Sequence, residues 1–179
     1  MIKQLNNIIK ILPDLIKHPE KWDSLIINRR KPFTYRAFHI FKGGEFDGIR
    51  VCLHKFDPCD EVEAFFHPHP WPSAMMVLVG QYKMRVGGDD DLNCSKPSIF
   101  AELILAPGSQ YSMADPGGWH SVQPLETCYS VMVNGPPWGD LASPAAPTTK
   151  GKDLDKMDND GLHRHLATFH SLLAIRHGH

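Results

Sequence analysis

The sequence is poor in cysteine and in long apolar runs, and its charges nearly balance. The longest apolar run, Ala74 to Val79, is too short to cross a bilayer. The formal net charge is −1, so there is no basic excess to attract nucleic acid or anionic lipid. The four cysteines include no CxxC pair, and we expect them to be free thiols. We therefore expect neither a nucleic-acid partner nor a membrane partner.

The first residues also lack the features of an export signal. Lys3, Asn6 and Asn7 interrupt what would be the apolar stretch of a signal peptide, and no small-residue cleavage site follows. Together with four free thiols, this pattern predicts a cytoplasmic protein.

Apolar residues make up 42% of the 179 residues, which suits one domain with a substantial core. Residues 1–30 carry apolar side chains at helical spacing, and Pro13 interrupts that pattern. We expect one or two amphipathic helices before Arg30, packed on the main body of the protein. The apolar residues that set the first helical pattern are Ile2, Leu5, Ile8, Ile9 and Leu12.

Residues 31–140 have a different texture. Short runs rich in β-branched and aromatic residues are separated by glycine, proline and aspartate. Closely spaced strands with no helices between them predict a sandwich or a barrel, so the fold class is all-β. The predicted strands are 33–41, 48–56, 62–69, 74–79, 82–87, 98–105, 110–113, 120–123 and 127–133.

Residues 141–179 combine a linker arm with a helix. The segment after Asp140 is rich in proline, alanine and threonine, which is typical of a linker. Apolar residues then recur at helical spacing from Leu162 to Leu173 and predict a C-terminal helix of about three turns. His163 and His165 are two residues apart on this helix and do not face each other, so we interpret them as surface residues.

The stretch FFHPHPWP, residues 65–72, places two histidines one residue apart. In an extended strand, residues i and i+2 point the same way, so His67 and His69 share a face. Pro68 and Pro70 restrict the histidines that precede them to extended conformations. Two imidazoles facing one point indicate a metal site, because imidazole binds iron, zinc, copper and nickel well. His120, which follows a glycine turn, is the best candidate for a third ligand.

These residues resemble the first motif of the cupin superfamily, G-x5-H-x-H-x(3,4)-E-x6-G. His67, His69 and Gly80 match its spacing, while Ser73 stands where that motif has its glutamate and Glu61 stands where it has its first glycine. The resemblance implies a single cupin-type β-barrel, or jelly-roll, over residues 31–140 with helices at both ends.

The second cupin motif, G-x5-P-x-G-x2-H-x3-N, has a weaker counterpart. Gly117 and His120 fit it, and Pro124 replaces its asparagine. The two motifs together cover residues 61–124, about a third of the chain. This resemblance implies that His67, His69 and His120 bind the metal. Cupin barrels often pair, so it also implies a homodimer.

A cupin with three histidine ligands and no glutamate is similar to the thiol dioxygenases, of which cysteine dioxygenase is the best known. Three neutral imidazoles leave a divalent ion with its full charge, which favours an anionic substrate such as a thiolate. Arg36 precedes the barrel roughly where that family has its carboxylate-binding arginine. The family's Ser-x-His-x-Tyr triad falls on Ser130, Met132 and Asn134, so only the serine is retained.

Four residues are candidates for binding a small-molecule substrate. Arg36 is the candidate anchor, Arg50 can point into the barrel or out of it, and Trp119 lies beside the second motif. Tyr82 is one of three tyrosines that can replace the missing tyrosine of the triad, the others being Tyr111 and Tyr129. Nothing in the sequence selects among the three.

Several functions remain open on the residues alone. A mononuclear non-haem oxygenase with Fe(II) is the leading hypothesis, and zinc or nickel suits the same ligands. Zinc would instead activate water and give a hydrolase. The missing glutamate, asparagine and tyrosine favour a non-catalytic module that binds metal or a small ligand. The simplest alternative is that His67 and His69 are ordinary hydrogen-bonded strand residues.

Overall fold

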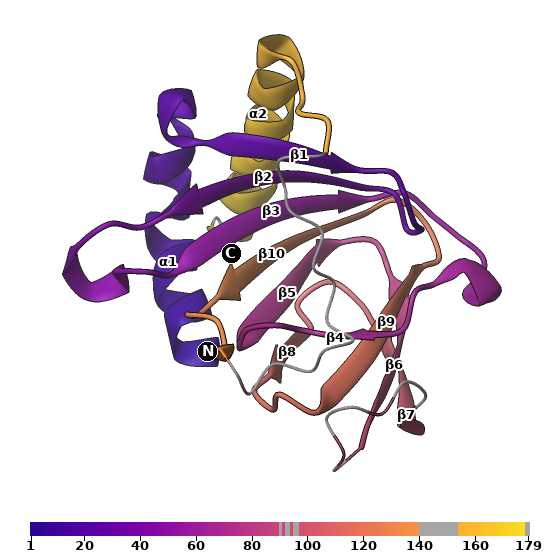
Figure 1. The fold of residues 1–179 in the computed structure, drawn as a ribbon. Helices are drawn as coiled ribbons and strands as arrows, with labels where there is room; N and C mark the ends of the chain where they lie inside the picture. Colours follow the sequence, from indigo (N-terminus) through magenta and orange to yellow (C-terminus); the bar gives the residue numbers. More distant parts are fainter. Residues whose placement is uncertain (90, 92–93, 95–96, 140–153, 178–179) are drawn as a thin grey trace.

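The computed structural model describes residues 1–89, 91, 94, 97–139 and 154–177, and it consists of two antiparallel sheets with one helix near each end of the described chain (Figure 1). The predicted all-β class with flanking helices is therefore confirmed. The elements are α1 (Ile2–Ile16), β1 (Asp23–Ile27), β2 (Thr34–Ile40), β3 (Arg50–Phe56), β4 (His67–Pro68), β5 (Ser73–Val79), β6 (Tyr82–Gly88), β7 (Ser98–Leu105), β8 (Gln110–Met113), β9 (Gly118–Pro124), β10 (Cys128–Asn134) and α2 (Asn159–His177).

The strands form a six-stranded sheet and a four-stranded sheet. The larger has the order β1-β2-β3-β10-β5-β8, and the smaller has the order β4-β9-β6-β7. Among the described residues, no strand pair joins one sheet to the other, so hydrogen bonding does not close a barrel. The two layers agree with a sandwich-like arrangement, whereas the closed cupin barrel of the sequence prediction is not confirmed.

Alternation along the strands creates one core on each side of the larger sheet. On β3, Val51 and Leu53 face the helices, while Cys52 and Phe56 face the smaller sheet. Figure 1 shows α1 and α2 together on the outer face of the larger sheet, away from β4 and β9. This arrangement leaves the space between the sheets as the place where inward-facing polar side chains can meet.

The N-terminal segment differs from the sequence prediction in two ways. Helix α1 continues through Pro13, and its buried residues Leu5, Ile8 and Leu12 pack in the outer core. The segment 23–27, predicted as helix, is strand β1, which pairs antiparallel with β2. Ile26 and Ile27 favour an extended chain, and the hydrogen bonds offered by the free edge of β2 favour it further.

The C-terminal helix is longer than predicted. Helix α2 spans Asn159–His177, whereas apolar periodicity alone predicted about three turns. His165, interpreted from sequence as a surface residue, is 8% exposed, and its Nε2 lies 3.1 Å from the carbonyl oxygen of Leu53. His163 is exposed, as predicted. The linker prediction falls mainly on residues 141–153, which lie outside the described residues.

Two further predictions can be compared with the structure. Cys52, Cys59, Cys94 and Cys128 are all free thiols, as the spacing indicated. In the part of the chain that the structure describes, neither helix has the length and apolar character needed to span a membrane.

Candidate metal centre

The chain approaches the histidine pair through a turn instead of the long strand predicted over residues 62–69. Residues Glu61–Glu63 form a 3-10 turn, and the Glu63 carboxylate accepts a hydrogen bond from the Asp60 backbone at 3.1 Å. Only His67–Pro68 is a strand, β4, which pairs with β9 at the edge of the smaller sheet. A short edge strand is what the flanking prolines allow, because proline cannot donate to a ladder.

The structure brings His67, His69 and His120 together, as the sequence predicted. His67 and His120 are directly opposite each other in the β4–β9 pair. Each of the three residues offers one ring nitrogen, and these nitrogens all lie within 4.8 Å of one another. Register between two strands, rather than proximity in sequence, therefore joins His120 to the pair.

The spacing of the nitrogens can be compared with that around a metal ion. Nε2 of His69 and Nε2 of His120 are 2.8 Å apart. Two ligands at right angles, each about 2.1 Å from a metal, would be separated by about 3.0 Å. A small opening of this pair would therefore admit an ion, and the three-histidine cluster fits a metal site.

Contacts at Nδ1 hold the rings of His67 and His69, whereas Nδ1 of His120 is buried without a partner. Nδ1 of His67 lies 2.9 Å from the carbonyl oxygen of Phe65, which can only accept, so this nitrogen carries the proton. Nδ1 of His69 lies 3.0 Å from the hydroxyl of Ser73. Nε2 of His67 is then available as a metal ligand, and Nε2 of His69 is available in the tautomer in which Nδ1 donates to the Ser73 hydroxyl. Partners of this kind set the tautomer and orientation of ligating histidines.

Burial keeps the three imidazoles neutral. Removal from solvent lowers the pKa of His67, lowers that of His69 to about 3, and lowers that of His120 well below its usual value. The neighbouring imidazoles lower the pKa of His69 and His120 further. A neutral imidazole is the form that binds a metal, so the site is ready for an ion at neutral pH.

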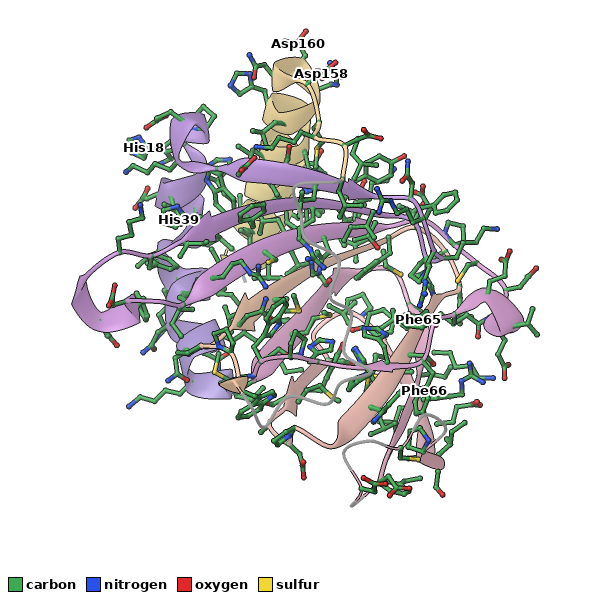
Figure 2. The ribbon with its side chains drawn as sticks, viewed as in Figure 1. His18, His39, Phe65, Phe66, Asp158 and Asp160 are labelled. Atoms are coloured by element: carbon green, nitrogen blue, oxygen red, sulfur yellow. The ribbon has the colours of Figure 1, made fainter. Side chains whose placement is uncertain are left out.

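An aromatic side chain supports His67 from outside the cluster. The ring of Phe65 stacks on His67 with centroids 5.1 Å apart and planes 3° apart. The guanidinium of Arg30 lies 4.3 Å from the centroid of the Phe65 ring. The next residue, Phe66, instead packs against Trp119 at 5.6 Å. Figure 2 labels both phenylalanines, which lie beside β4. Sequence analysis missed this role of Phe65, although Phe65 lies two residues before His67.

Ser73 stands where the cupin motif has its glutamate, and it contacts a histidine of the cluster without joining the cluster. Ser73 is 3% exposed, and its hydroxyl contacts His69. The nearby carboxylate of Glu63 pairs with Lys31 at 2.8 Å. Among the described residues, no aspartate, glutamate or cysteine belongs to the cluster with the three histidines. The cluster is thus neutral, as the sequence indicated.

The two candidate arginines come from neighbouring strands and both face the space between the sheets. Arg36 on β2 donates from Nε to Nε2 of His54 on β3 at 2.7 Å. Arg50 on β3 shares the strand face of His54 and lies over the Trp71 ring at 4.3 Å. The direction of Arg50, which the sequence left open, is therefore inward.

The aromatic candidates are less close to the histidines. Tyr82 is fully buried in the inner core, and its hydroxyl donates to the sulfur of Met75. Trp119 neighbours His120 on β9, so strand alternation turns it to the opposite face, where it contacts Phe66.

The structure distinguishes the three tyrosines that the sequence could not. The ring of Tyr111 lies 6.0 Å from that of His120, and its hydroxyl also donates to the sulfur of Met75. Tyr129 packs against Phe169 of α2 in the outer layer, at 5.6 Å. Tyr111 is therefore the one of the three whose ring contacts a histidine of the cluster.

Comparisons with known proteins find likeness only at the level of structure. No protein-family model and no curated protein matches the chain. Hydroxypropylphosphonic acid epoxidase from S. wedmorenis aligns with 65% of this chain and 56% of its own at 15% identity, with a TM-score of 0.48. An Fe(II) form of that enzyme gives 16% identity over 65% of this chain and 57% of its own, with a TM-score of 0.49.

A conserved protein of unknown function from Streptococcus pyogenes is also similar. It aligns with 60% of this chain and 78% of its own at 13% identity, with a TM-score of 0.43. The present chain thus spans little more than half the length of the epoxidase. Likenesses at this level do not bear on activity.

Proposed function

We propose that the protein is a mononuclear non-haem oxygenase that binds Fe(II) through His67, His69 and His120. The observation that carries this proposal is the cluster of three neutral imidazoles, one buried and two half-buried, with no carboxylate among them. Such a set adds no negative charge to a divalent ion and occupies only part of its coordination sphere. The remaining positions suit a small anionic substrate, such as a thiolate, and oxygen.

The chain's own residues hold the ligands and orient the substrate. The Phe65 carbonyl and the Ser73 hydroxyl keep Nε2 of His67 and His69 directed at the ion. Arg36 supplies a positive charge for an acidic group on the substrate. Tyr111 lies beside His120 and takes the place of the tyrosine that is absent at Asn134. Iron, when bound, supplies the electron transfer that oxygen chemistry requires.

The proposed fold is the cupin jelly-roll, and the proposed assembly is a homodimer. The spacing of His67, His69 and Gly80 supports the fold, as does the placement of His120 opposite His67 on the neighbouring strand. The assembly rests on the cupin resemblance alone. Light scattering of the purified protein would give twice the chain mass for a dimer, and a monomer mass would contradict it.

Oxygen consumption tests the proposed activity directly. The protein is loaded with Fe(II) without air and then mixed with aerated buffer and a panel of thiols and diketones. A thiol dioxygenase consumes one O2 for each thiol converted to sulfinate, with both oxygen atoms retained in the product. We expect uptake with at least one substrate, and none in His120→Ala.

The same panel identifies the alternative functions. A binding module would show saturable spectral shifts with a ligand but no oxygen uptake. A hydrolase would be active with zinc and without oxygen. Either result would overturn the oxygenase proposal while leaving the three-histidine site in place.

A further inference from the structure

The space between the two sheets contains positive charge that no acid balances. The residues of β2, β3, β5 and β10 that alternate toward this space include Arg36, Arg50 and His54 but no aspartate or glutamate. Among the described residues, neither arginine forms an ion pair with a carboxylate. Arg36 and Arg50 are both half-buried, and a cation that is partly removed from water without an anionic partner carries a desolvation cost. An anion held between the sheets would offset it.

The first arginine is accompanied by hydrogen-bond donors that have no partner. Arg36, His54 and Ser130 lie side by side on β2, β3 and β10, because each is the register partner of the next. Since Nε2 of His54 accepts from Arg36, its Nδ1 carries the proton, and this atom is buried without a partner. The hydroxyl of Ser130 is also buried without a partner. A guanidinium, an N–H and an O–H thus form one group of donors.

The second arginine has a comparable group of its own. Nε of Arg50 is buried without a hydrogen-bond partner, and so is Nε1 of Trp71, over whose ring the guanidinium lies. Arg50 is also the register partner of Asn134, which in turn opposes Ser73, the residue that contacts His69. The second donor group therefore lies along the row of residues that ends at the metal site.

The two groups are separated along the strands. Arg50 and His54 are four residues apart on β3, which corresponds to about 13 Å between their Cα atoms. The row between them contains Phe38, Cys52, Met132 and Met75, all of them apolar or weakly polar. Two separate donor groups with an apolar stretch between them are complementary to a short carbon chain with an acidic group at each end.

We propose that the substrate carries two carboxylate groups, one bound by Arg36, His54 and Ser130 and the other by Arg50 and Trp71. This inference rests on the proposed function, since it places the substrate beside the metal ligands. It extends that function from a small anion to a short-chain dianion. Each carboxylate would receive a guanidinium and at least one of the donors that are otherwise unpartnered.

Succinate and butyrate are matched probes for this proposal, because they have the same number of carbons and differ by one carboxylate. Their affinities are measured by isothermal titration calorimetry on the zinc-loaded protein, which carries out no oxygen chemistry. We expect succinate to bind at least about tenfold more tightly than butyrate. In Arg36→Met and in Arg50→Met, this preference should be largely lost, so that the affinities for succinate and butyrate differ by no more than about twofold.

Arg85→Met is the control variant, since Arg85 lies on the outer face of β6 and interacts with Glu61 and Ser121. It should keep the preference for succinate. If Arg36→Met fails to fold because it leaves His54 without its donor, Arg50→Met still tests the proposal, as its Nε makes no hydrogen bond.

The proposal is overturned by equal affinity for the two probes, by an unchanged preference in both arginine variants, or by no binding of succinate at millimolar concentration. None of these measurements involves oxygen. Failure of the oxygenase proposal and failure of the dianion proposal can therefore be distinguished.

Discussion

The hydroxyl of Ser73 lies 3.0 Å from Nδ1 of His69, at the position where the cupin motif has its glutamate ligand. A glutamate there would add a negative charge to the metal site, whereas the serine contacts the far side of a neighbouring imidazole. With serine at this position, the three-histidine cluster stays neutral and one of its rings gains a hydroxyl contact. At this one position, a glutamate could bind a metal directly, whereas Ser73 can only contact a histidine of the cluster.

Ser73→Ala tests this orienting role. Loss of the hydroxyl frees the His69 ring to rotate, so metal affinity should fall by about tenfold to a hundredfold while the fold is kept. Ser24→Ala is a matched control, because Ser24 is equally buried and its hydroxyl accepts a hydrogen bond from Met157 far from the site. Competition with a chelator measures the metal affinity of both variants. Equal affinity in wild type and Ser73→Ala would show that the contact does not position His69.

Phe65→Ala tests the aromatic support of His67. The substitution removes the stacked ring but keeps the backbone carbonyl that accepts from Nδ1, so metal affinity should fall several-fold, short of complete loss. Phe66→Ala removes a ring of the same size that packs on Trp119 instead. A larger loss of metal affinity in Phe66→Ala than in Phe65→Ala would contradict the role given to Phe65.

His54 makes the stability of the protein depend on pH. Burial, and then the charge of Arg36, holds the pKa of His54 well below its usual value. Below about pH 6.5 the unfolded chain therefore binds a proton at this residue that the folded chain does not. The free energy of unfolding consequently falls as the pH falls, by up to about 1.4 kcal/mol per pH unit for this group.

His54→Gln should reduce that slope, because glutamine keeps an acceptor for Arg36 but does not titrate. The measurement is urea unfolding at several pH values between about pH 6.5 and pH 5, with a chelator present. His163→Gln, at an exposed position on α2, should leave the slope unchanged. If His54→Gln had the same slope as wild type, His54 would not be held neutral in the folded state.

Phe169→Ala tests how α2 is attached to the larger sheet. Phe169 is fully buried and contacts Tyr129 on β10, so the truncation leaves a cavity in the outer core. It should lower the free energy of unfolding by about 3–5 kcal/mol. Ile175→Ala, at a residue that is 67% exposed on the same helix, should change it by less than about 0.5 kcal/mol. Similar effects of the two variants would mean that α2 is not docked as described.

Local patterns in the sequence predicted much of the site. The His67–Pro68–His69 spacing and the glycine turn before His120 identified the three residues that the structure brings together. The alternation of apolar and polar residues also predicted most strands of the sheets, because a period of two can be recognised in the sequence alone. These features need no knowledge of which strands are neighbours.

Features that depend on neighbouring strands could not be obtained in this way. β1 forms because β2 offers it an open edge, which residues 23–27 alone do not reveal. The inward direction of Arg50 follows from the register of β3 with β10. His165 is buried because Leu53, far away in sequence, offers it a carbonyl. In each case the missing information is a contact between two separate elements of the fold.

The three-histidine metal site is tested most directly by the metal content of the purified protein beside a His67→Ala/His120→Ala double variant. A second double variant, His163→Ala/His170→Ala on α2, controls for nonspecific binding by histidine. We predict about one iron per chain in the wild type and in the control, and none in the first variant. No bound metal in the wild type, even after Fe(II) is added without air, would show that these three histidines do not form a metal site.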